Sequence, residues 1–224
     1  MLALKGIDYD SVHVLPGNQR IHLRAAGFRN GTVPALKLDG RRIQGSMAIS
    51  RELEALQPEP RLFPDDPELR RQVEAAERWG DEQFQPVPRR ILRWALTQDV
   101  SLRVWLAELD GTMPAPGVAA RLTGPISRYY AWLVRANKDR ARQDVASLPA
   151  MLDQVSELIE QRVVTTEKPN AATLQVMCTV RSLLGFTDFV ELIEARSYAP
   201  LARELFPDFP SEQVPPFVDR LGLR

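Results

Sequence analysis

The proline-rich stretch at residues 57–67 (QPEPRLFPDDP) constrains the fold of this 224-residue chain more than any other segment. It holds four prolines, too many for a helix or a central strand, because each proline removes a backbone donor and restricts φ. Before this stretch the chain mixes strand and helix patterns, whereas after it the apolar spacing is helical almost to the end. The sequence therefore predicts an α/β domain over residues 1–57, a linker over 58–66 and an all-helical domain over 67–224.

Short alternating patterns and turn signals organise the first domain. Residues 10–14 alternate polar and apolar side chains, which predicts a short strand. A second predicted strand at 32–38 is followed by Asp39-Gly40, a dipeptide typical of two-residue hairpin turns, and residues 41–44 would return antiparallel. The apolar spacing after Ser46 is that of one helix face, so the predicted order is strand, loop, hairpin and helix.

Apolar periodicity predicts a series of helices in the second domain. Asp66 can cap the first of them with Pro67 at its first position, and Pro86 and Pro88 should end or kink it. Further helices are predicted at about 89–97, 100–109, 118–136, 142–162, 171–185, 188–195 and 199–205. The tail from Phe206 is rich in proline, which predicts an extended segment that wraps over the surface.

Charge and composition narrow the classes of function. Lys plus Arg equals Asp plus Glu at 29 each, and short pairs such as Arg89-Arg90 indicate solvated faces, so we expect no nucleic-acid partner. No apolar run approaches the roughly 20 residues that cross a bilayer, and the N-terminus lacks a signal-peptide pattern, so we expect a cytoplasmic protein without a membrane partner. One cysteine, Cys178, and two histidines, His13 and His22, argue against a disulfide or a metal site.

Several stretches in this order resemble the glutathione transferase family, in its bacterial members. LALKGIDYD at 2–10 is similar to the end of the family's first helix and its entry into the second strand. TVPALKLDGRRIQGSMAISRELEAL at 32–56 is similar to the third and fourth strands and the third helix, and KPNAATLQ at 168–175 to the N-capping box of a buried helix. The resemblance implies an incomplete α/β thioredoxin-like N-terminal domain followed by an all-α helical-bundle C-terminal domain.

The resemblance also implies a glutathione site in the first domain. In the family the Val-Pro bond is cis, so that the backbone of Val33 would pair with the cysteinyl backbone of glutathione and Pro34 would fix the turn. A trans proline at a strand start is the alternative. Ser46 offers a hydroxyl and helix N-terminal amides to the γ-glutamyl carboxylate, unless it is only an N-cap. Gly45 departs from the Glu or Gln that the family has at this position.

Two further sets of residues are candidates by the same resemblance. Gln19 and Arg20 lie in a predicted loop at 17–24 where the family recruits groups for the glycine carboxylate of glutathione; a solvated loop is the alternative. Trp79, Phe84 and Trp94 could line a hydrophobic substrate pocket between the domains, or could pack in the core.

No catalytic residue is expected in this chain. The family activates its thiol with a Tyr, Ser or Cys near the start of its first helix, and Met1 aligns late in that helix. Either the native chain extends upstream of an internal methionine, or the protein is a truncated, non-catalytic relative. Cys178 is typical of a small buried side chain, Tyr9 of a surface hydroxyl, and His13 has no partner in its spacing, so none replaces the missing group.

The leading hypothesis is a glutathione transferase-like protein that conjugates or otherwise uses glutathione, its co-substrate, with a small hydrophobic electrophile. It is an enzyme on this hypothesis if residues upstream of Met1 exist, and a homodimer by resemblance. The alternative is a non-catalytic binding or interaction module of the same fold. A thiol-transfer enzyme is a third hypothesis and needs a cysteine outside this sequence.

Overall fold

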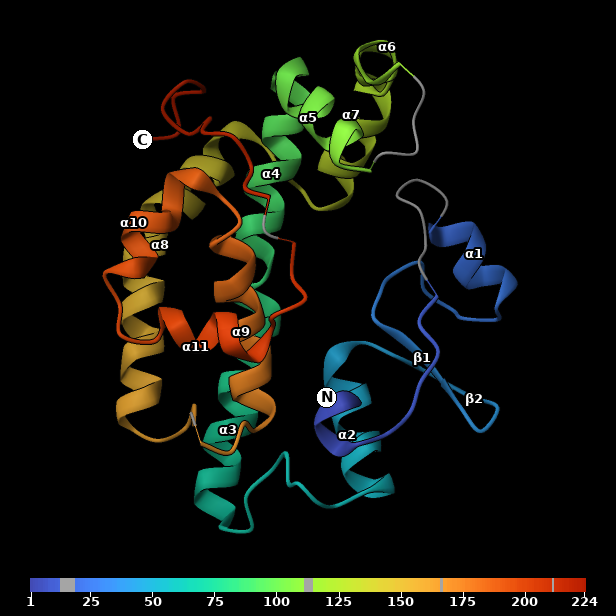
Figure 1. The fold of residues 1–224 in the computed structure, drawn as a ribbon, viewed down its shortest axis with the longest axis vertical. Helices are drawn as coiled ribbons and strands as arrows, with labels where there is room; N and C mark the ends of the chain where they lie inside the picture. The colour runs from blue at the N-terminus through green and yellow to red at the C-terminus, as the bar shows by residue number, and fades with distance from the viewer. Residues whose placement is uncertain (13–18, 111–114, 166, 211) are drawn as a thin grey trace.

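A computed structural model describes residues 1–224 except 13–18, 111–114, 166 and 211. Figure 1 shows a smaller N-terminal part beside a larger helical part. The N-terminal part holds the 3₁₀ turn η1 (Ala3–Lys5), α1 (Gln19–Ala25), β1 (Ala35–Leu38), β2 (Arg41–Gln44) and α2 (Ser46–Leu56). The helical part holds α3 (Pro67–Trp79), the π-helical turn η2 (Gly80–Phe84), α4 (Pro86–Gln98), α5 (Val100–Asp110), α6 (Pro116–Leu122), α7 (Gly124–Leu133), α8 (Lys138–Glu160), α9 (Ala171–Leu183), the 3₁₀ turn η3 (Thr187–Phe189), α10 (Val190–Glu194) and α11 (Ala199–Leu205).

The hairpin of β1 and β2 is confirmed. The strands are antiparallel, with Leu38 opposite Arg41 and Ala35 opposite Gln44. Asp39 and Gly40 have φ angles of 46° and 82°, the left-handed values that a two-residue hairpin turn of type I′ requires at both central positions. The turn therefore fixes the register that the Asp-Gly dipeptide predicts.

Two predictions for the N-terminal part are wrong. Residues 10–12 of the strand predicted at 10–14 form no strand, and the rest of that segment lies outside the described residues. Most of the loop predicted at 17–24 is the helix α1, which buries Leu23 and ends where the Phe28 N–H donates to the Leu23 carbonyl at 2.8 Å. A helix this short buries so few side chains that the sequence shows no apolar period for it.

The first long helix of the helical part starts and bends where the sequence indicates. Asp66 accepts a hydrogen bond from the Leu69 N–H at 2.7 Å, with Pro67 at the first helical position, which confirms the predicted cap. After Trp79 the backbone passes through the π-helical turn η2, and α4 then begins at Pro86. The predicted break near the prolines is confirmed, and its local form is this wider turn.

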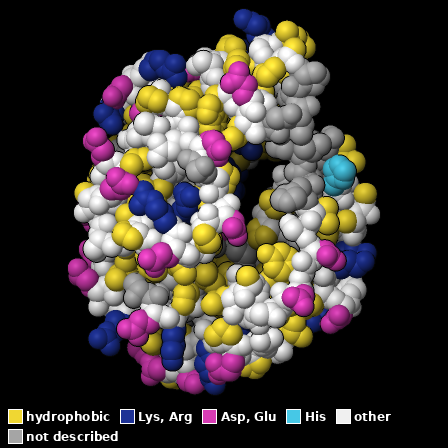
Figure 2. Space-filling view, viewed as in Figure 1, with side chains coloured by type: hydrophobic (Ala, Val, Ile, Leu, Met, Phe, Trp, Pro, Cys, Tyr) yellow, Lys and Arg dark blue, Asp and Glu magenta, His cyan; other side chains and the backbone are white. Residues whose placement is uncertain are grey.

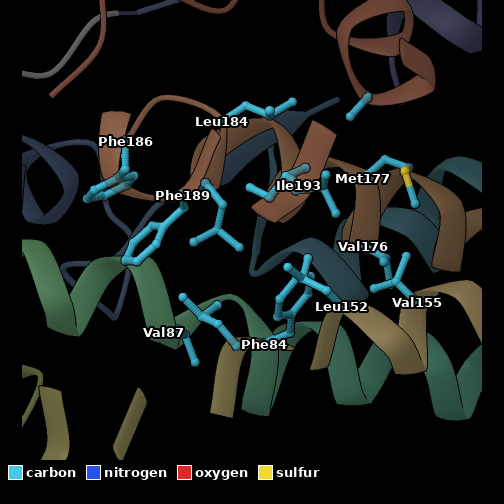
Figure 3. Close-up of a cluster of buried hydrophobic side chains, with 14 of the residues drawn as sticks. Phe84, Val87, Leu152, Val155, Val176, Met177, Leu184, Phe186, Phe189 and Ile193 are labelled. Atoms are coloured by element: carbon cyan, nitrogen blue, oxygen red, sulfur yellow. The ribbon is translucent and has the colours of Figure 1, made fainter. Parts of the chain in front are cut away.

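The core of the helical part surrounds α9, which is buried on nearly all sides, as the close-up in Figure 3 shows for Val176 and Met177. Asn170 caps α9 by accepting a hydrogen bond from the Thr173 N–H at 2.9 Å, and it donates to the Val163 carbonyl at 2.8 Å. The predicted capping segment is confirmed. It fixes the start of α9, which packs against α3, η2, α4 and α11.

Two further parts of the helical prediction can be compared with the structure. The helix predicted at 118–136 is divided into α6 and α7 at Thr123, where Gly124 and Pro125 follow. Among the described residues the tail from Phe206 forms no further helix, as predicted, and the Val214 N–H donates to the Gly185 carbonyl at 2.7 Å. It is not extended throughout, because residues 218–222 form turns and Phe217 and Val218 are buried in the core. Among the described residues, no helix is long and apolar enough to cross a membrane.

Two buried ion pairs hold α2 in place. The ammonium group of Lys5, which is only 1% exposed, lies 2.8 Å from Glu54 Oε2. Near the middle of α2, Arg51 pairs with the fully buried carboxylate of Glu77 in α3, which also accepts a hydrogen bond from Ser50 Oγ at 2.8 Å. These contacts tie the N-terminal part to the start of the helical part.

Candidate functional site: an arginine-lined cleft

A cleft of about 540 Å³ lies between the N-terminal part and helices α4 and α7, and Figure 2 shows the molecule hollowed between its two parts. The N-terminal wall is formed by Gln19, Arg20 and residues 31–33. The helical wall is formed by Pro86, Arg89, Arg90, Arg93, Tyr130, Leu133 and Val134. The cleft is thus basic and aromatic on one side and has exposed backbone on the other.

The backbone beside the cleft is open at Val33. The Val33-Pro34 bond is cis, as the family resemblance implied, and the side chain of Val33 is 57% exposed. Among the described residues, neither the N–H nor the C=O of Val33 makes a hydrogen bond. Both groups are therefore free to pair with an extended peptide-like ligand.

The start of α2 lies next to this segment, because the Gly45 N–H donates to the Pro34 carbonyl at 3.0 Å. Gly45 is the N-cap, with φ 92° and ψ 142°, a conformation that only glycine adopts readily. The departure from Glu or Gln at this position therefore has a backbone reason. Ser46 is the first helical residue rather than the cap, so the N-cap alternative for Ser46 is wrong.

The hydroxyl of Ser46 makes a contact that the sequence did not indicate. It donates to Asp81 Oδ1 at 2.9 Å, across from α2 to the π-helical turn η2. No side chain of the described residues caps the first N–H groups of α2, so these groups keep their partial positive charge. The hydroxyl of Ser46, the free N–H groups at the start of α2 and the carboxylate of Asp81 therefore lie close to one another.

Gln19 and Arg20 lie on the N-terminal wall of the cleft, and both are already engaged. Gln19 Nε2 donates to the Gly31 carbonyl at 3.1 Å, which holds α1 against the segment before Val33. Arg20 Nη1 donates to the hydroxyl of Tyr129 at 2.9 Å, which links the N-terminal part to α7. Gln44, which the sequence indicated only by its strand position, supports the same segment by donating to the Asn30 carbonyl at 2.9 Å.

The arginines of α4 were missed by the sequence analysis. Arg90 is neutralised by Asp144, with its Nε 2.7 Å from Oδ2 and its Nη2 2.5 Å from Oδ1. Arg89 and Arg93 are one helical turn apart, and neither forms an ion pair within the part of the chain that the structure describes. Arg89-Arg90 is visible in the sequence, but its place in a cleft depends on contacts with distant segments.

The environment of Arg93 is electrostatically unfavourable. Its guanidinium carbon lies 4.8 Å from the ring centroid of Tyr130. Burial lowers the pKa of Arg93 below its ordinary value; Tyr130 acts in the opposite direction, and the like charge of Arg89 adds to the lowering. Two unpaired guanidinium groups on one face of a helix repel each other, and an anion between them would relieve that repulsion.

The aromatic residues predicted for a substrate pocket lie elsewhere. Phe84 is fully buried, Trp94 is 8% exposed, and both belong to the core of the helical part. Trp79 packs against that core and stacks on Phe84 with ring centroids 5.1 Å apart. Their apolar area is used in core packing, which was the alternative interpretation, and none of the three lines this cleft.

Cys178 has the properties of a structural thiol. It is partly exposed on α9, and burial raises the pKa of its thiol above the ordinary value. We expect Ellman's reagent to react with Cys178 in the folded protein several-fold more slowly than with glutathione at pH 7.5, because less thiolate is present. Unfolded protein in urea is the control and should react at the rate of a free thiol. A faster reaction in the folded protein would contradict this assignment.

Among the described residues, no group of three or more His, Cys, Asp or Glu side chains is placed so that it could hold a metal ion.

Comparison with known proteins shows what the N-terminal part is similar to. Residues 1–61 match the family model for the glutathione S-transferase N-terminal domain. Over 73 residues the chain is 44% identical to maleylacetoacetate isomerase of Rattus norvegicus and to that of Mus musculus, which covers 31% of this chain and 34% of each relative. The chain thus spans about a third of the length of the curated relatives that it matches. No solved structure matches.

The fold and these matches define a thioredoxin-like N-terminal domain followed by a helical C-terminal domain, which confirms the predicted fold class. The N-terminal part of the chain is similar to the glutathione S-transferase N-terminal domain, in agreement with the sequence resemblance.

Proposed function

We propose that the protein is a glutathione-dependent transferase or isomerase that binds glutathione along the N-terminal wall of the cleft and an acidic electrophile against α4. The observation that carries the proposal is the position of the cleft. The free backbone of Val33 lies on one side of it, and the unpaired Arg89 and Arg93 lie on the other. The division into domains at residues 58–66 is part of the same proposal.

Glutathione fits the N-terminal wall by its chemistry. Its γ-glutamyl group carries a carboxylate and an ammonium group, which match the free amides at the start of α2 and the carboxylate of Asp81. Ser46 would exchange its hydrogen bond to Asp81 for one to the ligand carboxylate. The cysteinyl backbone would pair with Val33, and the glycine carboxylate would lie near Gln19 and Arg20.

The helical wall favours an electrophile with a carboxylate. Arg89 and Arg93 supply positive charge without an internal partner, whereas Leu133 and Val134 supply apolar area for the carbon skeleton. This differs from the purely hydrophobic electrophile expected from the sequence. The relatives are named as isomerases of maleylacetoacetate, an organic acid, which agrees with a basic cleft. The same positive charge would favour the thiolate form of bound glutathione.

Calorimetric titration of the full chain with glutathione tests the first half of the proposal. We expect binding in the micromolar to millimolar range and a roughly tenfold loss of affinity in Ser46→Ala, because one charge-assisted hydrogen bond is removed. The matched control is Ser156→Ala, since among the described residues Ser156 Oγ makes one hydrogen bond, to the Leu152 carbonyl of its own helix. No binding at 10 mM glutathione, on the order of the weakest specific affinities, would overturn the proposal.

A non-catalytic binding module is the second candidate, and the engaged state of Arg20 and Ser46 is the observation that favours it. Binding of glutathione without turnover of any acidic or neutral electrophile would select this candidate. We further propose a homodimer, which light scattering would measure.

A further inference from the structure

Helices α6 and α7 carry large exposed apolar side chains, all but Leu133 outside the lining of the cleft, that no other part of the chain covers among the described residues. Leu122 is 72% exposed and Trp132 71%, whereas Trp94 in the core is 8% exposed. The exposed apolar residues of the two helices are Val118, Leu122, Ile126, Tyr129, Trp132 and Leu133. Together with Arg121, Arg128 and Arg135 they are called the α6–α7 face below.

The spacing of these residues makes each helix amphipathic. Val118 and Leu122 are four residues apart on α6, and Ile126, Tyr129 and Leu133 follow at intervals of three and four on α7. Trp132 stacks on Tyr129 with ring centroids 6.1 Å apart. The exposed side chains therefore form stripes along the helices rather than isolated positions.

The charge of this segment is one-sided. Residues 115–138 contain Arg121, Arg128, Arg135 and Lys138 and no Asp or Glu, although positive and negative charges balance at 29 each over the whole chain. The three arginines are exposed, and none of these four cations forms an ion pair within the described ranges. The nearest acids along the chain are Asp110 before the segment and Asp139 after it.

Apolar stripes that include Trp and Tyr and are flanked by Arg are typical of helices that lie in the interface of an anionic membrane. A second copy of the chain suits the face less well, because a two-fold interface would bring the same arginines together. We propose that the α6–α7 face docks on an anionic lipid bilayer without crossing it. The sequence expectation of no membrane partner rested on the lack of a spanning segment and did not consider surface binding.

Docking would bring the cleft close to the bilayer surface. Leu133 belongs both to the face and to the lining of the cleft, and Tyr129 accepts the hydrogen bond from Arg20 on the opposite wall. The proposal does not depend on the proposed enzymatic function, because it rests on a different surface.

Flotation of the full chain with lipid vesicles tests the proposal. We expect binding to vesicles of 70% phosphatidylcholine and 30% phosphatidylserine and little binding to pure phosphatidylcholine. The double variant Arg121→Glu with Arg128→Glu should bind about 30-fold or more weakly, since each basic residue near an anionic surface is worth roughly a factor of five. The control makes the same charge change elsewhere, at the exposed Arg29 and Lys37, and should bind normally.

A second measurement begins with the unmodified protein, so that its first readout is independent of whether a variant folds. Brominated phosphatidylserine should quench the fluorescence of Trp132, and Trp132→Phe should remove most of the quenching, because Trp94 is buried and Trp79 and Trp105 are partly buried against the core. Absence of wild-type binding to anionic vesicles, equal binding to neutral vesicles, or equal binding of the two double variants would overturn the proposal. A dimer in light scattering that Leu122→Ser dissociates would assign the face to a second copy and would also overturn it.

Discussion

Replacement of Lys5 by Met is expected to lower the free energy of unfolding by about 3–5 kcal/mol, the usual cost of breaking a buried ion pair on one side. The ammonium group of Lys5 lies 2.8 Å from Glu54 Oε2, 2.6 Å from the Gln57 carbonyl and 2.9 Å from the Pro60 carbonyl. Methionine fills a similar volume but donates no hydrogen bond. It therefore leaves a carboxylate and two carbonyl groups without their cation.

The effect should be large because Glu54 organises the segment that leads into α3. It accepts hydrogen bonds from the Leu62 N–H at 2.9 Å and the Phe63 N–H at 3.3 Å, and both of these side chains are buried. Loss of Lys5 would thus weaken the connection between the N-terminal and helical parts, and not only a local contact. Urea unfolding followed by circular dichroism measures the change.

A surface ion pair provides the control for Lys5. Arg71 is 71% exposed and pairs with Glu68 on the same helix, so Arg71→Met should cost less than about 1 kcal/mol. The double variant Lys5→Met with Glu54→Gln should lose less than the sum of the single variants, because neither charge is then left alone. Additive losses, or a cost for Lys5→Met as small as that for Arg71→Met, would show that the pair does not stabilise the fold.

The features predicted correctly from the sequence depend on neighbours in the chain. Asp39 and Gly40 are residue types that adopt the positive φ angles of a two-residue hairpin turn. Asp66 and Asn170 each cap a helix by accepting a hydrogen bond from an N–H three residues further along the chain. Such contacts are local, so residue type and spacing are sufficient to predict them. The helix α1 was missed because it buries little beyond Leu23 and so shows no apolar period.

The features of the cleft that were missed depend on segments far apart in the chain. Arg90 is paired with Asp144, 54 residues away, and only this pairing shows that its neighbours Arg89 and Arg93 are the cations left unpaired. The spacing of Arg89, Arg90 and Arg93 in the sequence does not show which of them forms an ion pair and which remain unpaired. Likewise, Trp94 is placed in the core by its contacts with several helices and not by its own helix.

Replacement of Arg93 by Met is expected to weaken binding of an acidic glutathione conjugate and, at the same time, to stabilise the fold. S-carboxymethylglutathione carries a carboxylate on its sulfur substituent, and S-methylglutathione lacks it. On the proposed binding mode, loss of one charge-assisted contact should lower the affinity for the first about 10- to 100-fold and leave the second nearly unchanged. Calorimetric titration with both ligands separates the carboxylate contact from binding of glutathione itself.

The gain in stability follows from the direction of the pKa shift. Burial lowers the pKa of Arg93 in the folded state below its ordinary value; Tyr130 opposes this shift and Arg89 adds to it, and the net lowering means that folding disfavours the charged form throughout the neutral range. Removing the charge should therefore raise the melting temperature throughout the neutral range. A residue kept for packing would show the opposite sign, since its loss would lower the melting temperature. A lower melting temperature, or equal losses of affinity for both ligands, would mean that Arg93 does not form an anion site.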